Sequence, residues 1–264
     1  MTADLDRALL VWPLAVSLVT TFGTAGFVLL SAGERVFGPR STAASLVNLW
    51  RLLATVIFLV SPLVLLNMTA DMAGVSWTSA VDFIPQVLAG THAGRVFQWF
   101  LPIALVLLLS AYIPLPQSIR TTMLCLSTGV LLLLQALLSH AIDKGTLAVT
   151  VYFFHEIAVG LWVGALVALW MVARYGDPPD AWVEHAARRV SKVAFWSVIG
   201  LVITGIYTAY NGLGFDLYRL LFSAYGRTLI AKVILFIGIV AVGAYNLIGW
   251  CRTSEIRLRA KLAM

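Results

Sequence analysis

The sequence predicts an all-α integral membrane protein, built as a bundle of about seven transmembrane helices, and three observations predict it. First, 61% of the 264 residues are hydrophobic and 11% are charged, against roughly 25% charged residues in ordinary soluble domains. Second, the charges are concentrated between apolar runs of about 20 residues, the length at which a helix crosses about 30 Å of hydrocarbon. Third, the alternating polarity of membrane β-strands is absent, so helices that satisfy their own backbone hydrogen bonds are expected.

The apolar runs are separated by short stretches rich in proline, glycine and charge. "IPLPQS" separates the third run from the fourth, "IDKGT" separates the fourth from the fifth, and "YGDPPD" ends the fifth. The first run lacks the basic region and cleavage site of a signal peptide, so it is expected to remain as a helix. We expect spans at 11 to 31, 49 to 69, 94 to 114, 119 to 140, 147 to 173, 190 to 212 and 227 to 250.

Residues 1 to 264 are expected to form a single polytopic membrane domain, and the sequence leaves an eighth span open. The basic stretch "DPPDAWVEHAARRVSKVAF" predicts a short interfacial helix before the sixth span, with His185 as a surface residue. Within the fifth span, "GLWVG" places Gly160 and Gly164 four residues apart, a small-residue face that lets another helix approach closely.

The distribution of basic residues predicts the orientation. Twelve of the 18 Lys and Arg residues lie on one side, in or next to the first, third and fifth connections and the C-terminus, and six lie on the other side. Because cytoplasmic loops carry the excess of positive charge, we expect a cytoplasmic C-terminus and an external N-terminus. Topology therefore accounts for the net charge of +6, so the expected partner surface is the lipid bilayer and no nucleic acid is expected.

A pair of related segments suggests an internal repeat. "THAGRVFQWFLPIALVLLL" opens the third span and "SAYGRTLIAKVILFIGIV" opens the seventh, so that Gly94 and Arg95 correspond to Gly226 and Arg227. If spans one to three correspond to spans five to seven, the bundle contains parallel three-helix repeats.

Candidate metal ligands collect on the external side of this topology. His92 precedes the third span, His140 ends the fourth, and His155 lies about two turns into the fifth; Met68 and Met72 follow the second span. Imidazole and thioether together favour copper, and thioether sulfur favours Cu(I) in particular. The alternative is that the interfacial histidines are hydrated and the methionines pack. An ionisable residue inside a span is by default a functional candidate.

Glu156 and Lys232 are charged residues inside the fifth and seventh spans, at similar depths from the ends of their helices. A pair between them would offset much of the cost of both charges in hydrocarbon. The same residues, with Arg227 at the start of the seventh span, could instead line an ion path.

Two cysteines lie toward the cytoplasmic ends of the fourth and seventh spans. Cys125 and Cys251 are candidate exit ligands for a soft ion that leaves the membrane. The alternative is that both thiols are inert, because buried cysteines commonly pack as small hydrophobic residues.

Three motifs in order resemble the copper resistance protein D (CopD) family over residues 139 to 246. They are "SHAIDKGTLAVTVYFFHEIAVGLWVGALVAL", "RRVSKVAFWSVIGLVITGIYTAYNGLG" and "SAYGRTLIAKVILFIGIVAVGAYN". "GTHAGRVF" is the best matching segment of the N-terminal half. The positions that match the family's two histidines and its last motif are His140, His155, Tyr225, Gly226, Arg227 and Lys232. Glu156 departs from an expected apolar residue and Leu247 from a basic one.

The resemblance implies a bacterial inner-membrane protein that moves copper from periplasm toward cytoplasm, with a periplasmic copper carrier of the CopC type as partner. In such a membrane, the orientation expected from the basic residues makes the N-terminus periplasmic. A transporter is therefore expected rather than an enzyme. One alternative is a redox protein in which paired histidines hold a b-type haem and electrons reduce copper or another acceptor. Another is a metal receptor that docks a carrier without transporting the ion.

Overall fold

The computed structural model describes residues 2–30, 40–175, 180–214, 216–241 and 243, and these residues form helices and turns without a strand. The helices are α1 Thr2–Leu30, α2 Arg40–Ala73, α3 Trp77–Ala80, α4 Ile84–Gly90, α5 His92–Tyr112, α6 Gln117–Leu138, α7 Thr146–Tyr175, α8 Asp180–Leu213 and α9 Leu217–Phe222. Short 3-10 turns cover Val81–Phe83 and Ile142–Lys144. A further helical segment covers Ala224–Ala241.

The prediction of an all-α bundle with seven spans is confirmed. In the described residues, seven helices are long and apolar enough to cross a membrane. Their apolar segments are Leu9–Leu30, Ala44–Ala73, His92–Tyr112, Gln117–Leu138, Thr146–Met171, Arg188–Leu213 and Ala224–Ala241. The predicted end of the last span, residues 242 to 250, lies almost entirely outside the described residues.

The prediction of a separate interfacial helix before the sixth span is wrong. α8 runs without a break from Asp180 to Leu213. The physical reason is that no proline or glycine occurs between positions 181 and 199, so nothing in the sequence ends a helix there. The side chain of His185 lies outside the described side chains.

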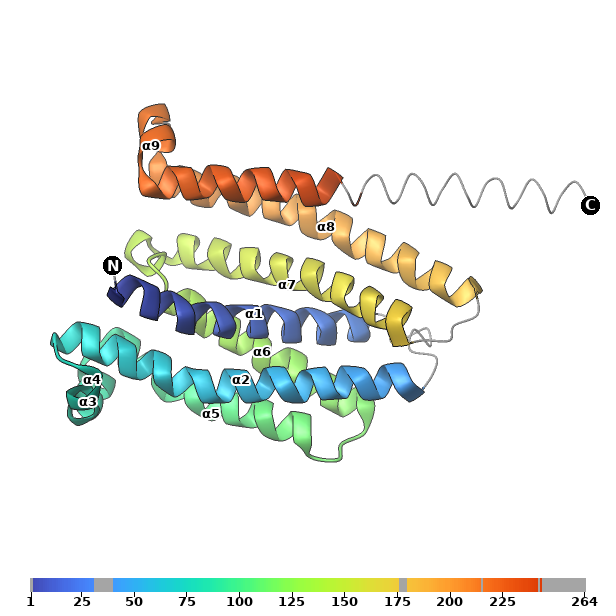
Figure 1. The fold of residues 1–264 in the computed structure, drawn as a ribbon, viewed down its shortest axis with the longest axis horizontal. Helices are drawn as coiled ribbons and strands as arrows, with labels where there is room; N and C mark the ends of the chain where they lie inside the picture. The colour runs from blue at the N-terminus through green and yellow to red at the C-terminus, as the bar shows by residue number, and fades with distance from the viewer. Residues whose placement is uncertain (1, 31–39, 176–179, 215, 242, 244–264) are drawn as a thin grey trace, which may run out of the picture. The chain divides into compact units, whose positions relative to one another are not determined.

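The chain divides into two compact parts, Met1–Gly205 and Ile206–Met264, and each is described by itself. Within the first part, α1 packs against α7, α2 and α6, and α5 packs against α6 and α2 (Figure 1). The largest fully buried side chains include Trp50 and Phe27, and the indole nitrogen of Trp50 donates to Thr24 Oγ1 at 2.9 Å. The expectation of one membrane domain and of three-helix repeats stays a prediction.

The contact between α1 and α7 is a direct contact of two helix backbones. A Cβ atom built on Gly23 would lie 1.7 Å from the carbonyl oxygen of Gly160, and one on Gly164 would lie 2.0 Å from the carbonyl carbon of Gly23. Since real Cβ atoms do not approach backbone so closely, only glycine fits at this crossing. The small-residue face at Gly160 and Gly164 therefore has its partner in α1.

The start of α5 is fixed by a compact cap. The side chain of Thr91 accepts a hydrogen bond from the backbone N–H of Gly94 at 2.9 Å, as an N-cap residue does. A Cβ atom on Gly94 would lie 1.9 Å from the carbonyl oxygen of Val87, so α4 can pack on α5 because this residue is glycine. His92, the first residue of α5, is positioned by this cap.

The last helical segment begins with the same local structure. The side chain of Ser223 accepts from the backbone N–H of Gly226 at 2.9 Å, and a Cβ atom on Gly226 would lie 2.2 Å from the carbonyl oxygen of Leu220 in α9. Both spans thus follow a short helix, a hydroxyl cap and a glycine that contacts that short helix. This local agreement supports the sequence correspondence of the two Gly-Arg pairs.

Replacing Thr91 or Ser223 by alanine is expected to lower the free energy of unfolding by about 1 kcal/mol each, because each change removes an N-cap acceptor. Equilibrium unfolding of the purified protein in detergent measures this loss. Replacing the same residues by serine and threonine, respectively, keeps the hydroxyl and serves as the control. Equal stability of the alanine variants and the wild type would contradict the shared capping role.

Candidate functional site

One end of the first part collects the predicted external ligands. The end of α2, the start of α5, the end of α6 and the start of α7 lie at the same end, on the left in Figure 1. They do so because successive spans run in alternating directions and short connections join them. The polar residues near these helix ends are thereby brought into one region.

His92 and the end of α6 are in contact. His92 is exposed, and its Nε2 atom lies 3.2 Å from the backbone carbonyl oxygen of Leu137. Because a carbonyl oxygen only accepts, Nε2 carries the hydrogen and Nδ1 holds the lone pair that a metal would need. The cap at Thr91 and this hydrogen bond together orient the ring.

His140 follows Leu137 by three residues, so it lies close in the chain to the residue that His92 contacts. Its side chain is 94% exposed, and its Nδ1 atom lies 3.9 Å from a carboxylate oxygen of Asp143. The structure therefore places two exposed imidazoles at neighbouring helix ends, and their role as metal ligands stays a prediction.

The two methionines differ in exposure. Met72 is 53% exposed near the end of α2, whereas Met68, one turn earlier, is partly buried and packs against the main hydrophobic core. Asn67 and Asp71 form a hydrogen bond of 3.2 Å on the same helix. Of the two thioethers, that of Met72 is the accessible one.

His155 lies deeper in the bundle, in contact with α8. Its Nδ1 atom lies 2.8 Å from the hydroxyl oxygen of Thr204, and that hydroxyl donates to the carbonyl oxygen of Gly200 at 2.6 Å. Since the hydroxyl hydrogen is directed at the carbonyl, Nδ1–H donates to Thr204, and Nε2 holds the ring's lone pair. The contact with Thr204 was not predicted from the sequence.

Glu156 is buried, with 7% of its surface exposed, and it interacts with two neighbours. Gln135 Nε2 on α6 donates to its Oε1 atom at 2.9 Å, and Tyr152, one turn earlier on α7, interacts with the carboxylate. The other carboxylate oxygen and Gln135 Oε1 are buried acceptors without a hydrogen bond in the described residues. Because a buried acceptor without a donor is costly, this cluster can hold a further polar or cationic group.

Gln135 is the functional candidate that the sequence reasoning missed. The signal was present, since Gln135 is a lone amide inside the apolar run "VLLLLQALL". Polar residues inside a span are costly, so they are functional candidates for the same reason as charged residues. Lys232 and Arg227 belong to the segment Ala224–Ala241 in the second part. The predicted pair of Glu156 and Lys232 would join the two parts and stays a prediction.

The structure describes one of the two predicted cysteine ligands. Cys125 is a half-buried free cysteine on α6 that packs against the main core. Cys251 lies outside the described residues. The role of both as exit ligands stays a prediction.

Within the described residues, no three side chains of His, Cys, Asp or Glu come close enough together to hold a metal ion. The end of the bundle that carries His92 and His140 offers exposed single ligands on neighbouring helix ends instead of a closed cage. Chemically, such ligands suit an ion that arrives and leaves, whereas a structural metal site needs a full set of protein ligands.

Comparison with known proteins gives two family matches that together cover most of the chain. Residues 4–149 match the model described as "Copper resistance protein D-like, N-terminal domain", and residues 184–262 match "Copper resistance protein D". The chain is also 29% identical over 198 residues to "Copper transport protein CutJ" of Bacillus subtilis (strain 168). This match covers 67% of the chain and 35% of the relative, so the chain spans about a third of the relative's length. No solved structure matches the chain.

Proposed function

Because the chain belongs to the copper resistance protein D family, we propose that it moves copper from the periplasm toward the cytoplasm across a bacterial inner membrane. The observation that carries the proposal is the contact of His92 with the end of α6, next to the exposed His140. It supports a copper-collecting region at one end of the bundle. In this orientation the N-terminus is periplasmic and the C-terminus is cytoplasmic.

Copper is collected in two steps in this proposal. His92, His140 and the thioether of Met72 are exposed and bind the arriving ion, with Met68 behind them in the core. His155 lies deeper in its span and receives the ion next. Imidazole and thioether are soft enough to hold Cu(I), and a small number of ligands at each stage allows the ion to move on.

A periplasmic copper carrier of the CopC type delivers the ion. The exposure of His92 and His140 supports this step, because two accessible imidazoles leave coordination positions that the carrier's own ligands can fill during transfer. Copper is the cargo in this proposal, and a b-type haem held by the histidines is the alternative.

Beyond His155, the polar groups inside the bundle form the path. Glu156, supported by Gln135, supplies negative charge between α6 and α7. In the proposed path Lys232 and Arg227 supply positive charge, and Cys125 and Cys251 receive the ion on the cytoplasmic side. The buried Glu156 side chain supports this path, since an ionisable residue inside a span is by default a functional candidate.

Replacing both His92 and His140 by alanine is expected to lower the initial rate of copper uptake into proteoliposomes by about tenfold or more, because the collecting ligands are lost. The measurement is copper content of vesicles over time under reducing conditions. Unchanged uptake by a well-folded double variant would refute the assignment.

The matched control for that experiment is His185→Ala, which removes a histidine that is not assigned to the site and should leave uptake unchanged. A visible spectrum of the purified protein belongs to the same test. A Soret band that disappears in the double variant would favour the b-type haem alternative over copper transport.

A further inference from the structure

Two arginines from different helices meet at the end of α5, where α5 is joined to α6 (Figure 1). Arg51 on α2 donates from Nε to the carbonyl oxygen of Ala111 at 3.3 Å. Arg120, in the first turn of α6, donates to the carbonyl oxygen of Ile113 at 3.3 Å. Both guanidinium groups therefore contact the same short stretch of chain, residues 111 to 113.

The positive charge of these two arginines is not balanced by a carboxylate. Arg51 otherwise lies against the ring of Tyr112, 5.5 Å from its centre, and Arg120 otherwise contacts Gln117 Oε1 at 3.4 Å. In the part of the chain that the structure describes, neither arginine forms an ion pair, and Arg120 Nε is a buried donor without an acceptor. Because a guanidinium is always charged and has five N–H donors, each arginine keeps donors for a negatively charged partner.

The start of α6 adds further donors beside Arg120. Its N-cap residue is Pro116, which has no side-chain acceptor, and no acidic residue occurs in the first turn. The backbone N–H groups of Gln117, Ser118 and Ile119 therefore have no partner among the described residues. Since the N-terminus of a helix carries a partial positive charge, it favours an anion at the same place as the two arginines.

Exposed apolar side chains continue from this place along α6. Ile119, Met123, Leu126 and Val130 are between 38% and 66% exposed, and they recur at the spacing of one helix face. Because α6 is long and apolar enough to cross a membrane, this face is suited to contact lipid. The first turn of α6 then lies at the level of the lipid headgroups.

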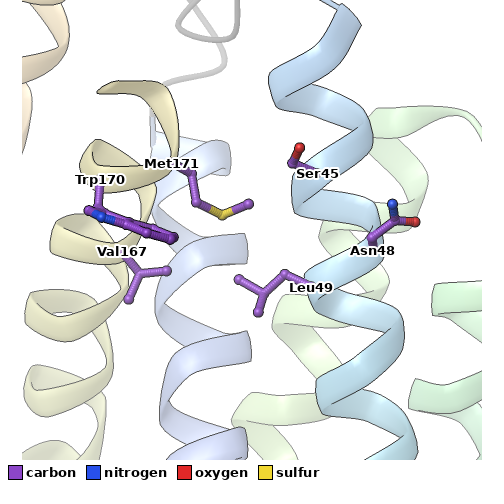
Figure 2. Close-up of a pocket in the computed structure, with 6 residues that line it drawn as sticks. All are labelled: Ser45, Asn48, Leu49, Val167, Trp170 and Met171. Carbon is purple, nitrogen blue, oxygen red and sulfur yellow. The ribbon is translucent and has the colours of Figure 1, made fainter. Parts of the chain in front are cut away.

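A groove of about 320 Å³ at the same end of the bundle does not offer this chemistry. It opens between α2 and α7 and is lined by Ser45, Asn48, Leu49, Val167, Trp170 and Met171. Figure 2 shows Met171 and Leu49 pointing toward one another across the groove, and none of the six lining side chains is charged. The charge that can select an anion lies at Arg51 and Arg120 instead.

We infer that Arg51, Arg120 and the start of α6 bind the phosphate group of one anionic phospholipid, whose acyl chains lie along the exposed face of α6. The order of groups along α6, charge at the first turn and hydrocarbon beyond it, is the order of groups along a phospholipid. A free phosphate ion would use the charge but not the apolar face, which favours a lipid as the source of the phosphate. The inference rests on this site alone and does not depend on the proposed copper path.

Native mass spectrometry of the purified full chain with phosphatidylglycerol and phosphatidylcholine of identical acyl chains tests the inference. Identical chains cancel the hydrocarbon contribution, so the ratio of the two retained lipids reports the headgroup. The wild type is expected to retain phosphatidylglycerol preferentially. Arg51→Gln and Arg120→Gln should each lower that preference about fivefold, because one charge near the membrane surface contributes about a factor of five. Arg51→Lys and Arg120→Lys keep the charge and should keep most of the preference.

Arg95→Gln is the matched control, because it removes an exposed arginine at the other end of α5 and should leave the preference unchanged. A second arm separates a lipid from a free anion by thermal unfolding of the wild type in detergent. Phosphatidylglycerol should raise the unfolding temperature, whereas inorganic phosphate should not raise it above the value in chloride of equal ionic strength.

Three results would overturn the inference. They are a wild type without a lipid preference, equal effects of Arg95→Gln and Arg120→Gln, and stabilisation by inorganic phosphate as large as that by phosphatidylglycerol, which would assign the site to a free anion. Circular dichroism and gel filtration establish that each variant is folded. If one glutamine variant fails to fold, the other variant and the lipid ratio of the wild type decide the outcome.

Discussion

Replacing Gly164 by leucine is expected to separate α1 from α7 and to lower the free energy of unfolding by about 3 kcal/mol or more. Even a methyl group at this position would lie 2.0 Å from the carbonyl carbon of Gly23. The obstacle is backbone and cannot rotate away, so a whole helix must move. Since α1 also packs against α2 and α6, that movement disturbs the centre of the first part. Equilibrium unfolding in mixed detergent micelles measures the loss.

The control is Gly129→Ala on α6, where a new Cβ atom would lie 3.5 Å from Phe22, an ordinary van der Waals contact. This variant is expected to be as stable as the wild type. A Gly164→Leu protein with wild-type stability would show that α1 and α7 are not in direct backbone contact.

Replacing Glu156 by glutamine is expected to lower the initial rate of copper uptake by about tenfold, which corresponds to about 1.4 kcal/mol in the barrier. The change removes the negative charge from the proposed path but keeps an oxygen that can accept the hydrogen bond from Gln135. The free energy of unfolding should therefore change by less than about 1 kcal/mol. Uptake into proteoliposomes and detergent unfolding are measured on the same preparation.

Glu156→Leu is the informative comparison, because it removes both the charge and the acceptor. The Nε2 group of Gln135 then loses its partner, and we expect the free energy of unfolding to fall by about 1 to 3 kcal/mol. If the free energy of unfolding of Glu156→Gln falls as far as that of Glu156→Leu, the carboxylate stabilises the fold as one partner of an ion pair. If Glu156→Gln is stable and transports copper normally, the charge has no part in the path.

Several features could be predicted from sequence because they depend on local composition alone. The seven spans follow from the lengths of the apolar runs, and the third and fourth were predicted within two residues of α5 and α6. The glycine pair at Gly160 and Gly164 predicted a close helix contact. The interfacial helix was predicted wrongly, since amphipathic composition does not specify where a helix ends when no breaker follows.

The site was harder to predict because its contacts join residues that are far apart in the chain. His92, His140 and His155 could be singled out by depth and residue type, but no sequence rule specifies which atom faces which neighbour. The hydrogen bonds of His92 to Leu137 and of His155 to Thr204 emerge only from the packing of helices. Gln135 was overlooked for the same reason, because its partner lies on the next helix.

Hydrophobicity and charge, read along the chain, were sufficient to establish that this protein crosses the membrane as a set of helices. They suffice because the cost of unpaired backbone in hydrocarbon is a property of each segment alone. Two features depended on the folded bundle. They are the identity of the helix that approaches Gly160 and Gly164, and the identity of the residue that contacts Glu156. The groove between α2 and α7 depended on it as well. These depend on how side chains of distant segments fit together, and close packing is a property of three dimensions that one-dimensional periodicity does not contain.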